Sequence, residues 1–317
     1  MKCTRCKAPA VIALPSHNAG FCPDCFLDFF SRQVEKGIKS GGYLSATDPD
    51  SGETVMTREP LFTHADRILV ALSGGKDSLA MMLELTRQGY DVTGLHIDLA
   101  IGESSQLARR QVERFCSKHS LNLEVLDMAK EGLPIPLVKE KLKRPICSAC
   151  GKIKRHYFNK AALDGKYDAI ATGHNLDDEI SRLFSNVLRW DASYLGEQGP
   201  LLPAEAGFAR KVKPLWRLGE FETANYAYLM GIEWHTLPCP YSKGASFSIH
   251  KQIWADLEHH MPGKRLNFYL EFLENGRKHF AGACREAEES LAPCPRCGYP
   301  TSADMCGVCR IKEMVAS

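Results

Sequence analysis

The sequence predicts an α/β fold: a doubly wound parallel sheet with helices on both faces and a small cysteine-rich knuckle at each end of the chain. Apolar strand patterns alternate with amphipathic helix patterns through the middle of the 317 residues, which is typical of parallel sheets. Two groups of four cysteines lie near the two ends. Each group sits in a segment too short to bury a core of its own, so metal binding would have to supply the folding energy.

The composition is that of a soluble globular protein. Hydrophobic residues make up 44% and charged residues 25%, with a formal net charge of +2. The sequence shows no apolar run long enough for a bilayer and no signal-peptide layout at the N-terminus. We therefore expect a cytoplasmic protein with no membrane partner. Because thiols stay reduced there, the thirteen cysteines indicate metal ligands or catalytic groups rather than disulfides.

The cysteine groups have the spacings C-x2-C-x15-C-x2-C and C-x2-C-x8-C-x2-C. Four thiolates are what a closed tetrahedral Zn²⁺ site requires, so we expect two structural zinc ions. Scattered reduced cysteines and redox-active Cys-x-x-Cys pairs are the alternatives, and the pairing of the pairs argues against both. The expected ligands are Cys3, Cys6, Cys22 and Cys25, and then Cys294, Cys297, Cys306 and Cys309.

The elements between the knuckles follow in order. Residues 26–38 place apolar side chains on one helical stripe, which predicts a packing helix. Residues 39–63 are rich in Gly, Ser, Asp, Thr and Pro, which indicates a linker or mobile loop. Residues 248–276 have a helical pattern. The predicted strands are 66–72, 91–99, 122–128 and 167–173. The predicted helices of the sheet are 78–88, 104–119, 150–163 and 176–189.

The motif SGGKDS occupies residues 73 to 78, between the first of these strands and the first of these helices. Gly74 and Gly75 allow the backbone to approach a phosphate closely. The amides at a helix start, together with the helix dipole, favour an anion. Three further residues add donors or positive charge: Ser73, Lys76 and Ser78. The motif is neither a Walker A loop nor a G-x-G-x-x-G loop, and it predicts a phosphate site.

A second motif, TGHNLDDE, runs from Thr172 to Glu179 at the end of the strand 167–173. Ligands of such sheets bind at the carboxyl ends of the strands, so we expect this motif beside the phosphate site. Asp177 and Asp178 could hold Mg²⁺, which takes carboxylate and phosphate oxygens. The alternative is that Asn175 and the aspartates only cap a helix. The pairing with SGGKDS favours the site.

Cys147 and Cys150 form a Cys-x-x-Cys pair with no second pair nearby. Together with Cys239 they form a group of three cysteines, for which three interpretations are open. One is a zinc site completed by His156, the second is a pair that carries sulfur as a persulfide or disulfide, and the third is an iron–sulfur cluster with three protein ligands. The two remaining cysteines lie in helix-like contexts, where packed thiols are expected: Cys116 and Cys284.

Residues 139–160 form a basic window with eight basic side chains and one acidic side chain, Glu140. Such a window suits a phosphate-rich partner, although a solvated helix face is the alternative. The basic residues are Lys139, Lys141, Lys143, Arg144, Lys152, Lys154, Arg155 and Lys160.

The SGGKDS loop at a strand–helix junction resembles the PP-loop, or N-type ATP pyrophosphatase, family. That resemblance implies a loop that holds the pyrophosphate of ATP and chemistry at the α-phosphate, where a substrate oxygen is adenylated. The family includes amidating enzymes as well as tRNA modifiers, so the loop implies ATP without fixing the substrate.

A narrower resemblance is to tRNA 2-thiolation enzymes of the TtuA/TtcA type, and the two knuckles favour the TtuA branch. It covers nearly the full chain, through both knuckles, SGGKDS, CSACGKIKRHYFN, TGHNLDDE, GPLLPAEAGFARKVKPLWRL and CPYSKGASFS in that order. It implies a tRNA-uridine 2-sulfurtransferase that converts ATP to AMP and pyrophosphate. The alternatives are another PP-loop adenylating enzyme, amidating or cytidine-2-thiolating, with structural zinc only, and a non-enzymatic zinc-ribbon RNA-binding protein.

The resemblance also implies roles for single residues. The ligands of a [4Fe-4S] cluster would be Cys147, Cys150 and Cys239, and three ligands leave one iron open for a sulfide. Lys154 would neutralise charge at the α-phosphate. Asp77 and Asp178 would serve Mg²⁺ and activation, and with Lys154 they are the expected catalytic residues. The expected ATP-binding residues are Ala71, Leu72, Ser73, Gly74, Gly75, Lys76, Asp77, Ser78, Ile97, Lys154, Gly173 and Asp178.

The expected partners are tRNA and a sulfur donor, either a thiocarboxylated ubiquitin-like carrier protein or sulfide, and the protein is a possible homodimer. The tRNA would lie over the basic window and the knuckles, with its target base flipped into the site. The expected units are an N-terminal knuckle (1–27), a helix and linker (28–63), a PP-loop catalytic domain (64–240), a helical extension (241–290) and a C-terminal knuckle (291–317).

Overall fold

The computed structural model describes residues 1–47, 54–142, 145–234, 236–241, 247–281 and 291–316. A six-stranded sheet lies at the centre in the order β7-β6-β5-β8-β10-β9. The neighbouring strands pair in parallel except β9, which pairs antiparallel with β10. The strands are β5 (Arg67–Ala71), β6 (Asp91–Asp98), β7 (Leu123–Asp127), β8 (Ala169–Thr172), β9 (Leu201–Leu202) and β10 (Lys211–Val212).

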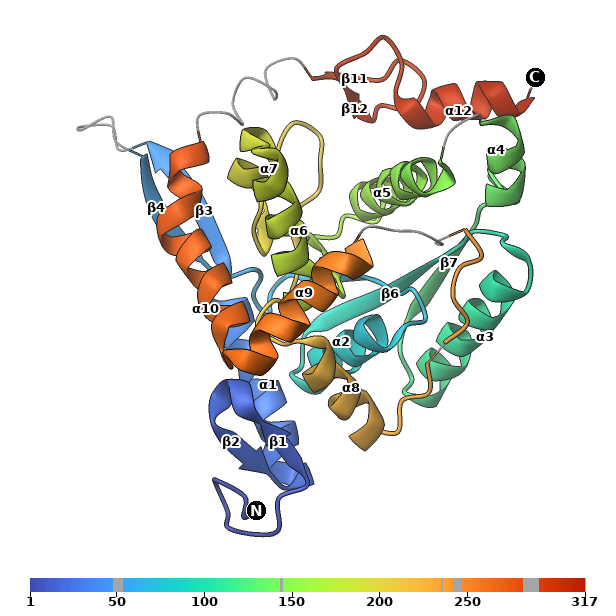
Figure 1. The fold of residues 1–317 in the computed structure, drawn as a ribbon. Helices are drawn as coiled ribbons and strands as arrows, with labels where there is room; N and C mark the ends of the chain where they lie inside the picture. Colours follow the sequence, from blue (N-terminus) through green and yellow to red (C-terminus); the bar gives the residue numbers. More distant parts are fainter. Residues whose placement is uncertain (48–53, 143–144, 235, 242–246, 282–290, 317) are drawn as a thin grey trace.

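Helices cover both faces of this sheet, as Figure 1 shows. On one face lie α2 (Lys76–Arg87) and α3 (Gly102–Lys118), and on the other lie α5 (Ile146–Asp164) and α6 (Leu176–Arg189). The chain moves from β5 outward to β7 and then returns to β8 on the other side of β5. The ends of β5 and β8 are therefore the point where the strand order reverses, which is where ligands of doubly wound sheets bind. The predicted doubly wound fold is confirmed.

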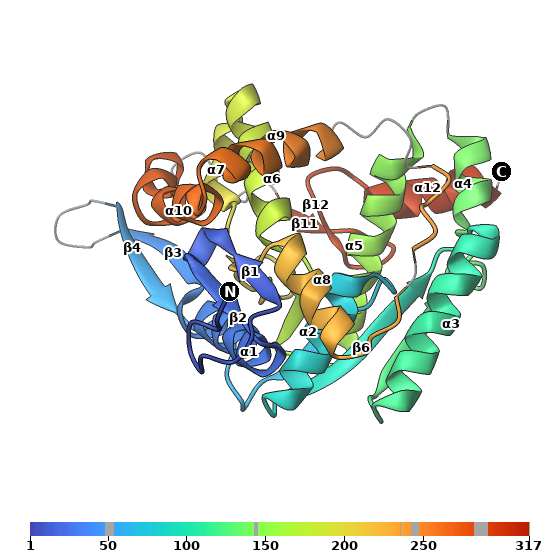
Figure 2. The ribbon, with the colours of Figure 1, turned by 60° about the horizontal axis from the view of Figure 1, so that its bottom comes forward.

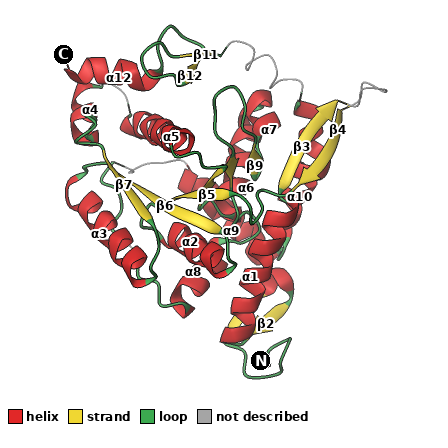
Figure 3. Cartoon of the chain, turned by 180° about the vertical axis from the view of Figure 1, so that it is seen from behind, coloured by secondary structure: helices red, strands yellow, loops and turns green. Residues whose placement is uncertain are grey.

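The two knuckles lie at opposite ends of the molecule (Figures 1 and 3). The N-terminal knuckle contains β1 (Ile12–Leu14), a 3-10 turn (Pro15–His17) and β2 (Ala19–Phe21), and α1 (Pro23–Ser40) follows. Its buried side chains continue into the main core. The C-terminal knuckle contains β11 (Ala292–Pro293), β12 (Pro300–Thr301) and α12 (Gly307–Ala316). It shares a separate apolar cluster with α4 (Ile135–Lys141) and α5.

The segment 39–63 differs from the expected linker. The helix α1 extends to Ser40, and an antiparallel pair of strands follows, β3 (Gly42–Thr47) and β4 (Thr54–Glu59). Residues 48–53, between the two strands, lie outside the described residues. Tyr43 anchors the pair, because its side chain is buried and its ring meets the Trp216 ring edge-on at 6.3 Å. The prediction of a mobile loop is wrong for these strands, since composition alone does not separate a polar hairpin from a loop.

The predicted helical region 248–276 is divided into two helices, α9 (Phe247–His260) and α10 (Lys264–Glu271). A π-helical turn (Phe272–Gly276) and a 3-10 turn (Arg277–Phe280) follow. The break occurs at Gly263, whose φ of +86° an L side chain rarely adopts. Among the described residues, sequence patterns also missed four helices: α4, α12, α7 (Ala192–Glu197) and α8 (Glu220–Leu229). Figure 2 shows α8 beside α2, against which it packs. No helix in the described part of the chain has the length and apolarity to cross a membrane.

Trp216 joins α1 to the rest of the core. Its side chain is fully buried, and its indole N–H donates to the carbonyl oxygen of Gly37 at 3.1 Å. Its ring also meets the Tyr269 ring edge-on, with centroids 5.9 Å apart. Loss of this side chain would leave a cavity and remove the hydrogen bond that joins α1 to this part of the core.

We expect Trp216→Ala to lower the free energy of unfolding by about 3–5 kcal/mol, the usual cost of removing a large buried aromatic side chain. Trp190, with a side chain that is 75% exposed, provides the control, and Trp190→Ala should change the free energy of unfolding by less than about 0.5 kcal/mol. Urea denaturation followed by circular dichroism measures both. Equal midpoints for the two variants would contradict the packing role of Trp216.

Candidate active site

The SGGKDS loop is braced by its own hydroxyl groups. The backbone N–H of Ser73 donates to the Ser78 hydroxyl oxygen at 3.2 Å, and that hydroxyl donates to the carbonyl oxygen of Gly75 at 3.0 Å. Gly74 has a φ of +83°, and a Cβ there would lie 3.2 Å from the carbonyl oxygen of Ala108. The loop therefore needs glycine at this position. It leads into the first turn of α2, whose N-terminal amides and dipole favour an anion.

Gly173 lets the end of β8 approach the start of α2. A Cβ at this position would lie 2.9 Å from the backbone nitrogen of Ser78 and 3.0 Å from its Cα, which is closer than real Cβ contacts allow. Both atoms belong to the backbone, so neither can move aside cheaply. This contact brings the TGHNLDDE motif directly beside the phosphate loop, as the sequence predicted.

Asp77 ties three elements together. Its Oδ2 lies 3.0 Å from the Lys76 ammonium. Its Oδ1 accepts hydrogen bonds from the Asn175 amide at 3.2 Å and from the Thr223 hydroxyl at 2.5 Å. The carboxylate thus joins the phosphate loop, the loop after β8 and the first turn of α8.

Asp178 both caps α6 and reaches the site. The backbone N–H of Asn175 donates to Asp178 Oδ2 and the backbone N–H of Asp178 donates to Asn175 Oδ1, each at 3.1 Å, which is a complete capping box. Its Oδ1 lies 2.6 Å from the Lys251 ammonium. Burial lowers the pKa of Lys251, but Asp178 and Glu220 outweigh this and raise it, so the ammonium stays charged. The Asp178 carboxylate can therefore cap α6 and belong to the site at the same time.

Asp177 points in a different direction. Its side chain is 7% exposed and forms an ion pair with Arg265, and its Oδ2 accepts from the backbone N–H of Glu220 at 2.7 Å. The structure therefore commits Asp177 to joining α6, α8 and α10. The sequence predicts that two aspartates in this motif bind Mg²⁺. Of these, Asp178 shares a hydrogen-bond partner, Asn175, with Asp77.

The first turns of α5 carry a stripe of expected site residues. Cys147, Cys150 and Lys154 follow one another at spacings of three and four, which places them on one face of the helix. The Cys147 thiol donates to the carbonyl oxygen of Tyr241 at 3.4 Å, which brings the segment of Cys239 against this face. Burial raises the pKa of Cys150, the Lys154 ammonium opposes this, and the nearby thiols of Cys239 and Cys147 add to it.

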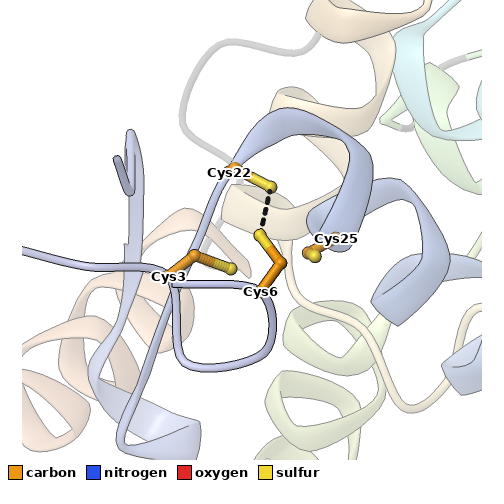
Figure 4. A group of neighbouring side chains, drawn as sticks. All are labelled: Cys3, Cys6, Cys22 and Cys25. Carbon is orange, nitrogen blue, oxygen red and sulfur yellow. Dashed lines mark hydrogen bonds between the residues drawn. The ribbon is translucent and has the colours of Figure 1, made fainter. Parts of the chain in front are cut away.

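The four N-terminal cysteines turn their sulfur atoms toward one another (Figure 4), and the C-terminal four do the same. Within each group all the ligand atoms lie within 4.8 Å of one another. Zn–S bonds of 2.3 Å in a tetrahedron require sulfur atoms about 3.8 Å apart. The sulfur atoms of Cys6 and Cys22 are 3.5 Å apart, and those of Cys297 and Cys306 are 3.6 Å apart. Both groups therefore fit a zinc ion.

The middle cysteines differ from these groups. Across the described residues, they form no metal-binding group as compact as the two quartets, with or without His156. His156 is buried against the Tyr299 ring of the C-terminal knuckle, with centroids 4.7 Å apart, and burial lowers its pKa to about 4. The structure therefore does not support the zinc site completed by His156. A four-iron cluster is larger than one zinc ion and spaces its ligands more widely, so the trio is compatible with one.

The other predicted residues have mixed outcomes. Ala71 and Leu72 lie at the end of β5, while Ile97 is buried in the apolar cluster shared with α5. The position of Ile97 near adenine stays a prediction.

Cys116 is a packed thiol, as predicted, and burial raises its pKa to about 11. Several basic-window residues are exposed: Lys139, Lys141, Lys152, Lys154, Arg155 and Lys160. Three predicted residues lie outside the described residues: Lys143, Arg144 and Cys284.

Sequence reasoning missed Glu220, Thr223 and Lys251. They lie on α8 and α9, outside both motifs. Thr223 contacts Asp77 and Lys251 contacts Asp178, while Glu220 pairs with Lys251. Thr223 is fully buried although it is polar. A sequence pattern gives no signal for such residues, because their contacts join segments far apart in the chain.

This site, a glycine-rich anion loop at the switch point of a doubly wound sheet, defines a PP-loop nucleotide-binding protein. Residues 52–239 match the PP-loop domain family, and residues 2–27 match the N-terminal LIM domain of 2-thiouridine synthetase TtuA. The chain is 36% identical to tRNA-5-methyluridine(54) 2-sulfurtransferase from Thermus thermophilus, covering 99% of this chain and 92% of that protein. It is also 36% identical to the Thermotoga maritima protein of the same name, at 99% and 97% coverage.

The fold is similar to that of the U34-tRNA thiolase NcsA from Methanococcus maripaludis, solved with its [4Fe-4S] cluster. The TM-score is 0.73 at 23% identity, over 99% of this chain and 96% of that one. The chain belongs to the family of TtuA-type tRNA thiolases.

We expect Gly173→Ala to weaken ATP binding, because its Cβ would push the start of α2 away from β8. Overpacking of this kind costs about 1–3 kcal/mol of stability, and the larger side chain of Gly173→Val should weaken both binding and stability further. Calorimetric titration with ATP and urea denaturation measure the series. An alanine variant that binds ATP as tightly as the wild type would show that the close approach at Gly173 is not required.

Proposed function

We propose that this protein is a tRNA 2-sulfurtransferase that thiolates the uridine at position 54. The observation that supports the proposal is the grouping of Cys147, Cys150 and Lys154 on one face of α5, with the segment of Cys239 against it, in a chain that also carries a PP-loop. Position 54 is favoured because the chain is 36% identical to proteins named for that position and only 23% identical to the position-34 thiolase. The proposed reaction belongs in the cytoplasm, where tRNA and ATP are available.

In the proposed reaction the phosphate loop binds the triphosphate of ATP. Lys76 and the amides at the start of α2 hold the pyrophosphate part, while Asp77 and Asp178 hold Mg²⁺. The O2 atom of the uridine attacks the α-phosphate and pyrophosphate leaves. Lys154 neutralises the charge that develops on the phosphate. Hydrosulfide (HS⁻) then attacks C2 and loses its proton, and AMP leaves with the former uridine oxygen. The sulfur stays at the sulfide level, so no net electron transfer takes place.

The cysteines divide into structural and reactive groups in this proposal. Cys147, Cys150 and Cys239 would hold a [4Fe-4S] cluster, which would supply the chemistry of sulfur delivery. The two quartets hold zinc and are closed by four thiolates each. The alternative is another PP-loop adenylating enzyme whose only metal is structural zinc. That alternative does not explain why the middle cysteines are grouped beside Lys154.

The proposed tRNA surface runs over the exposed basic side chains of α4 and α5 and onto the C-terminal knuckle beside them (Figure 1). Such a surface contacts the phosphate backbone while the target base leaves its stack. The sulfur donor is a thiocarboxylated ubiquitin-like carrier protein or free sulfide. A homodimer would present two such surfaces.

We expect protein purified without oxygen to form 2-thiouridine at position 54 when it is given ATP, Mg²⁺, sulfide and tRNA. One AMP and one pyrophosphate should form for each thiolated base, because each adenylate is consumed once. Nucleoside mass spectrometry and sequencing of the digested tRNA locate the product. Thiolation at position 34, or thiolation of cytidine, would contradict the assigned position or base.

We expect Cys239→Ser to abolish thiolation and to lower the iron content, while ATP binding stays within about twofold of the wild type. The control is Cys116→Ala, which replaces a packed thiol on α3 and should keep both activity and iron. Metal analysis of the wild type should find about four iron and two zinc per chain. Full activity in Cys239→Ser would rule out the three-cysteine site.

A further inference from the structure

Lys251, on α9, lies between two carboxylates at the site. Its ammonium is 2.6 Å from Asp178 Oδ1 and also forms an ion pair with Glu220. The Phe247 ring, one turn earlier on α9, has its centroid 5.6 Å from the same ammonium. The Lys251 side chain is 28% exposed and that of Asp178 is 19% exposed. The contact is thus more enclosed than an ordinary surface ion pair, which contributes little.

The two oxygens of the Asp178 carboxylate have different partners, and Lys251 is one of them. The capping bond from the Asn175 backbone holds Oδ2, and the Lys251 ammonium holds Oδ1. The χ2 torsion of an aspartate, which sets the orientation of its carboxylate plane, has a broad distribution and is only weakly restrained without contacts. With both oxygens bonded the carboxylate plane is fixed, whereas the capping bond alone leaves Oδ1 without a partner among the described contacts.

Glu220 connects this arrangement to the second carboxylate of the site. It lies in the first turn of α8, and the same turn carries Thr223, whose hydroxyl donates to Asp77 Oδ1 at 2.5 Å. One turn of helix therefore supports Asp77 directly and Asp178 through Lys251. Both catalytic carboxylates of the proposed reaction are thereby held relative to one another.

We propose that Lys251 is a positioning residue that fixes the orientation of the Asp178 carboxylate, with Glu220 as its anchor. The inference rests on the proposed function, in which Asp178 is a ligand of the Mg²⁺ that accompanies ATP. In this proposal Lys251 acts through Asp178 rather than on ATP or the base. Its role differs from that of Lys154, which acts on the α-phosphate.

Lys251→Met keeps the length and apolar stem of the side chain and removes the ammonium. We expect the kcat for 2-thiouridine formation to fall by about 10–100-fold, the usual effect of losing a partner that orients a site residue. The KM for ATP should stay within about twofold, because the phosphate loop is untouched. Lys251→Arg restores a cation that can bridge both carboxylates, and its kcat should lie nearer to that of the wild type.

The matched control is Lys39→Met. Lys39 forms an ion pair of the same length, 2.6 Å, with Glu35, but it lies on the surface of α1 and is 68% exposed. Its variant should keep the wild-type kcat. A wild-type kcat in Lys251→Met, or an equal loss in Lys251→Met and Lys251→Arg, would overturn the inference.

A crystal structure of Lys251→Met tests the same point without activity. The Asp178 carboxylate should rotate or become disordered while the capping box and the phosphate loop keep their positions. An unchanged Asp178 orientation would overturn the inference. A wild-type protein that thiolates no tRNA would instead refute the proposed function, and the orientation of Asp178 would still decide the role of Lys251.

Discussion

The close approach between the end of β8 and the start of α2 is the constraint on which the site depends. At Gly173 the two backbones come so near that a Cβ would lie 2.9 Å from the nitrogen of Ser78. That contact lets Asn175 reach Asp77 from the neighbouring loop. It also places the cap of α6 where the Asp178 carboxylate can serve both the helix and the site. A wider gap would separate the anion loop from the carboxylates that it needs.

The two knuckles support this arrangement in different ways. The N-terminal knuckle extends the main core, since Cys3, Leu14 and Phe21 belong to the same buried cluster as the strands of the sheet. The C-terminal knuckle has a cluster of its own, which it shares with the start of α5, the helix that carries Cys147 and Cys150. Folding of the C-terminal knuckle around a metal would therefore also stabilise the helix that presents the middle cysteines.

The sequence predicted the parts of this protein that are local and periodic. The four strands and four helices around the sheet, the anion loop and both quartets follow from spacing alone, and the structure contains them. Predictions failed where long-range packing decides the outcome. The polar composition of 39–63 concealed β3 and β4, which depend on burial of Tyr43 against Trp216. Asp177 and Asp178 are adjacent and chemically identical, yet only contacts with Arg265 and Lys251 distinguish them.

The compactness of their sulfur atoms distinguishes the two cysteine quartets from the middle trio. In the N-terminal quartet the backbone N–H of Cys6 helps to lower the pKa of Cys3 to about 6, while the contact with Cys22 raises the pKa of Cys25 to about 12. Thiols this crowded cannot all ionise without a cation, so the quartet fits a metal ion that neutralises them. The middle trio is less compact and lies beside the Lys154 ammonium. A wider group with a cation next to it is compatible with a centre larger than one zinc ion.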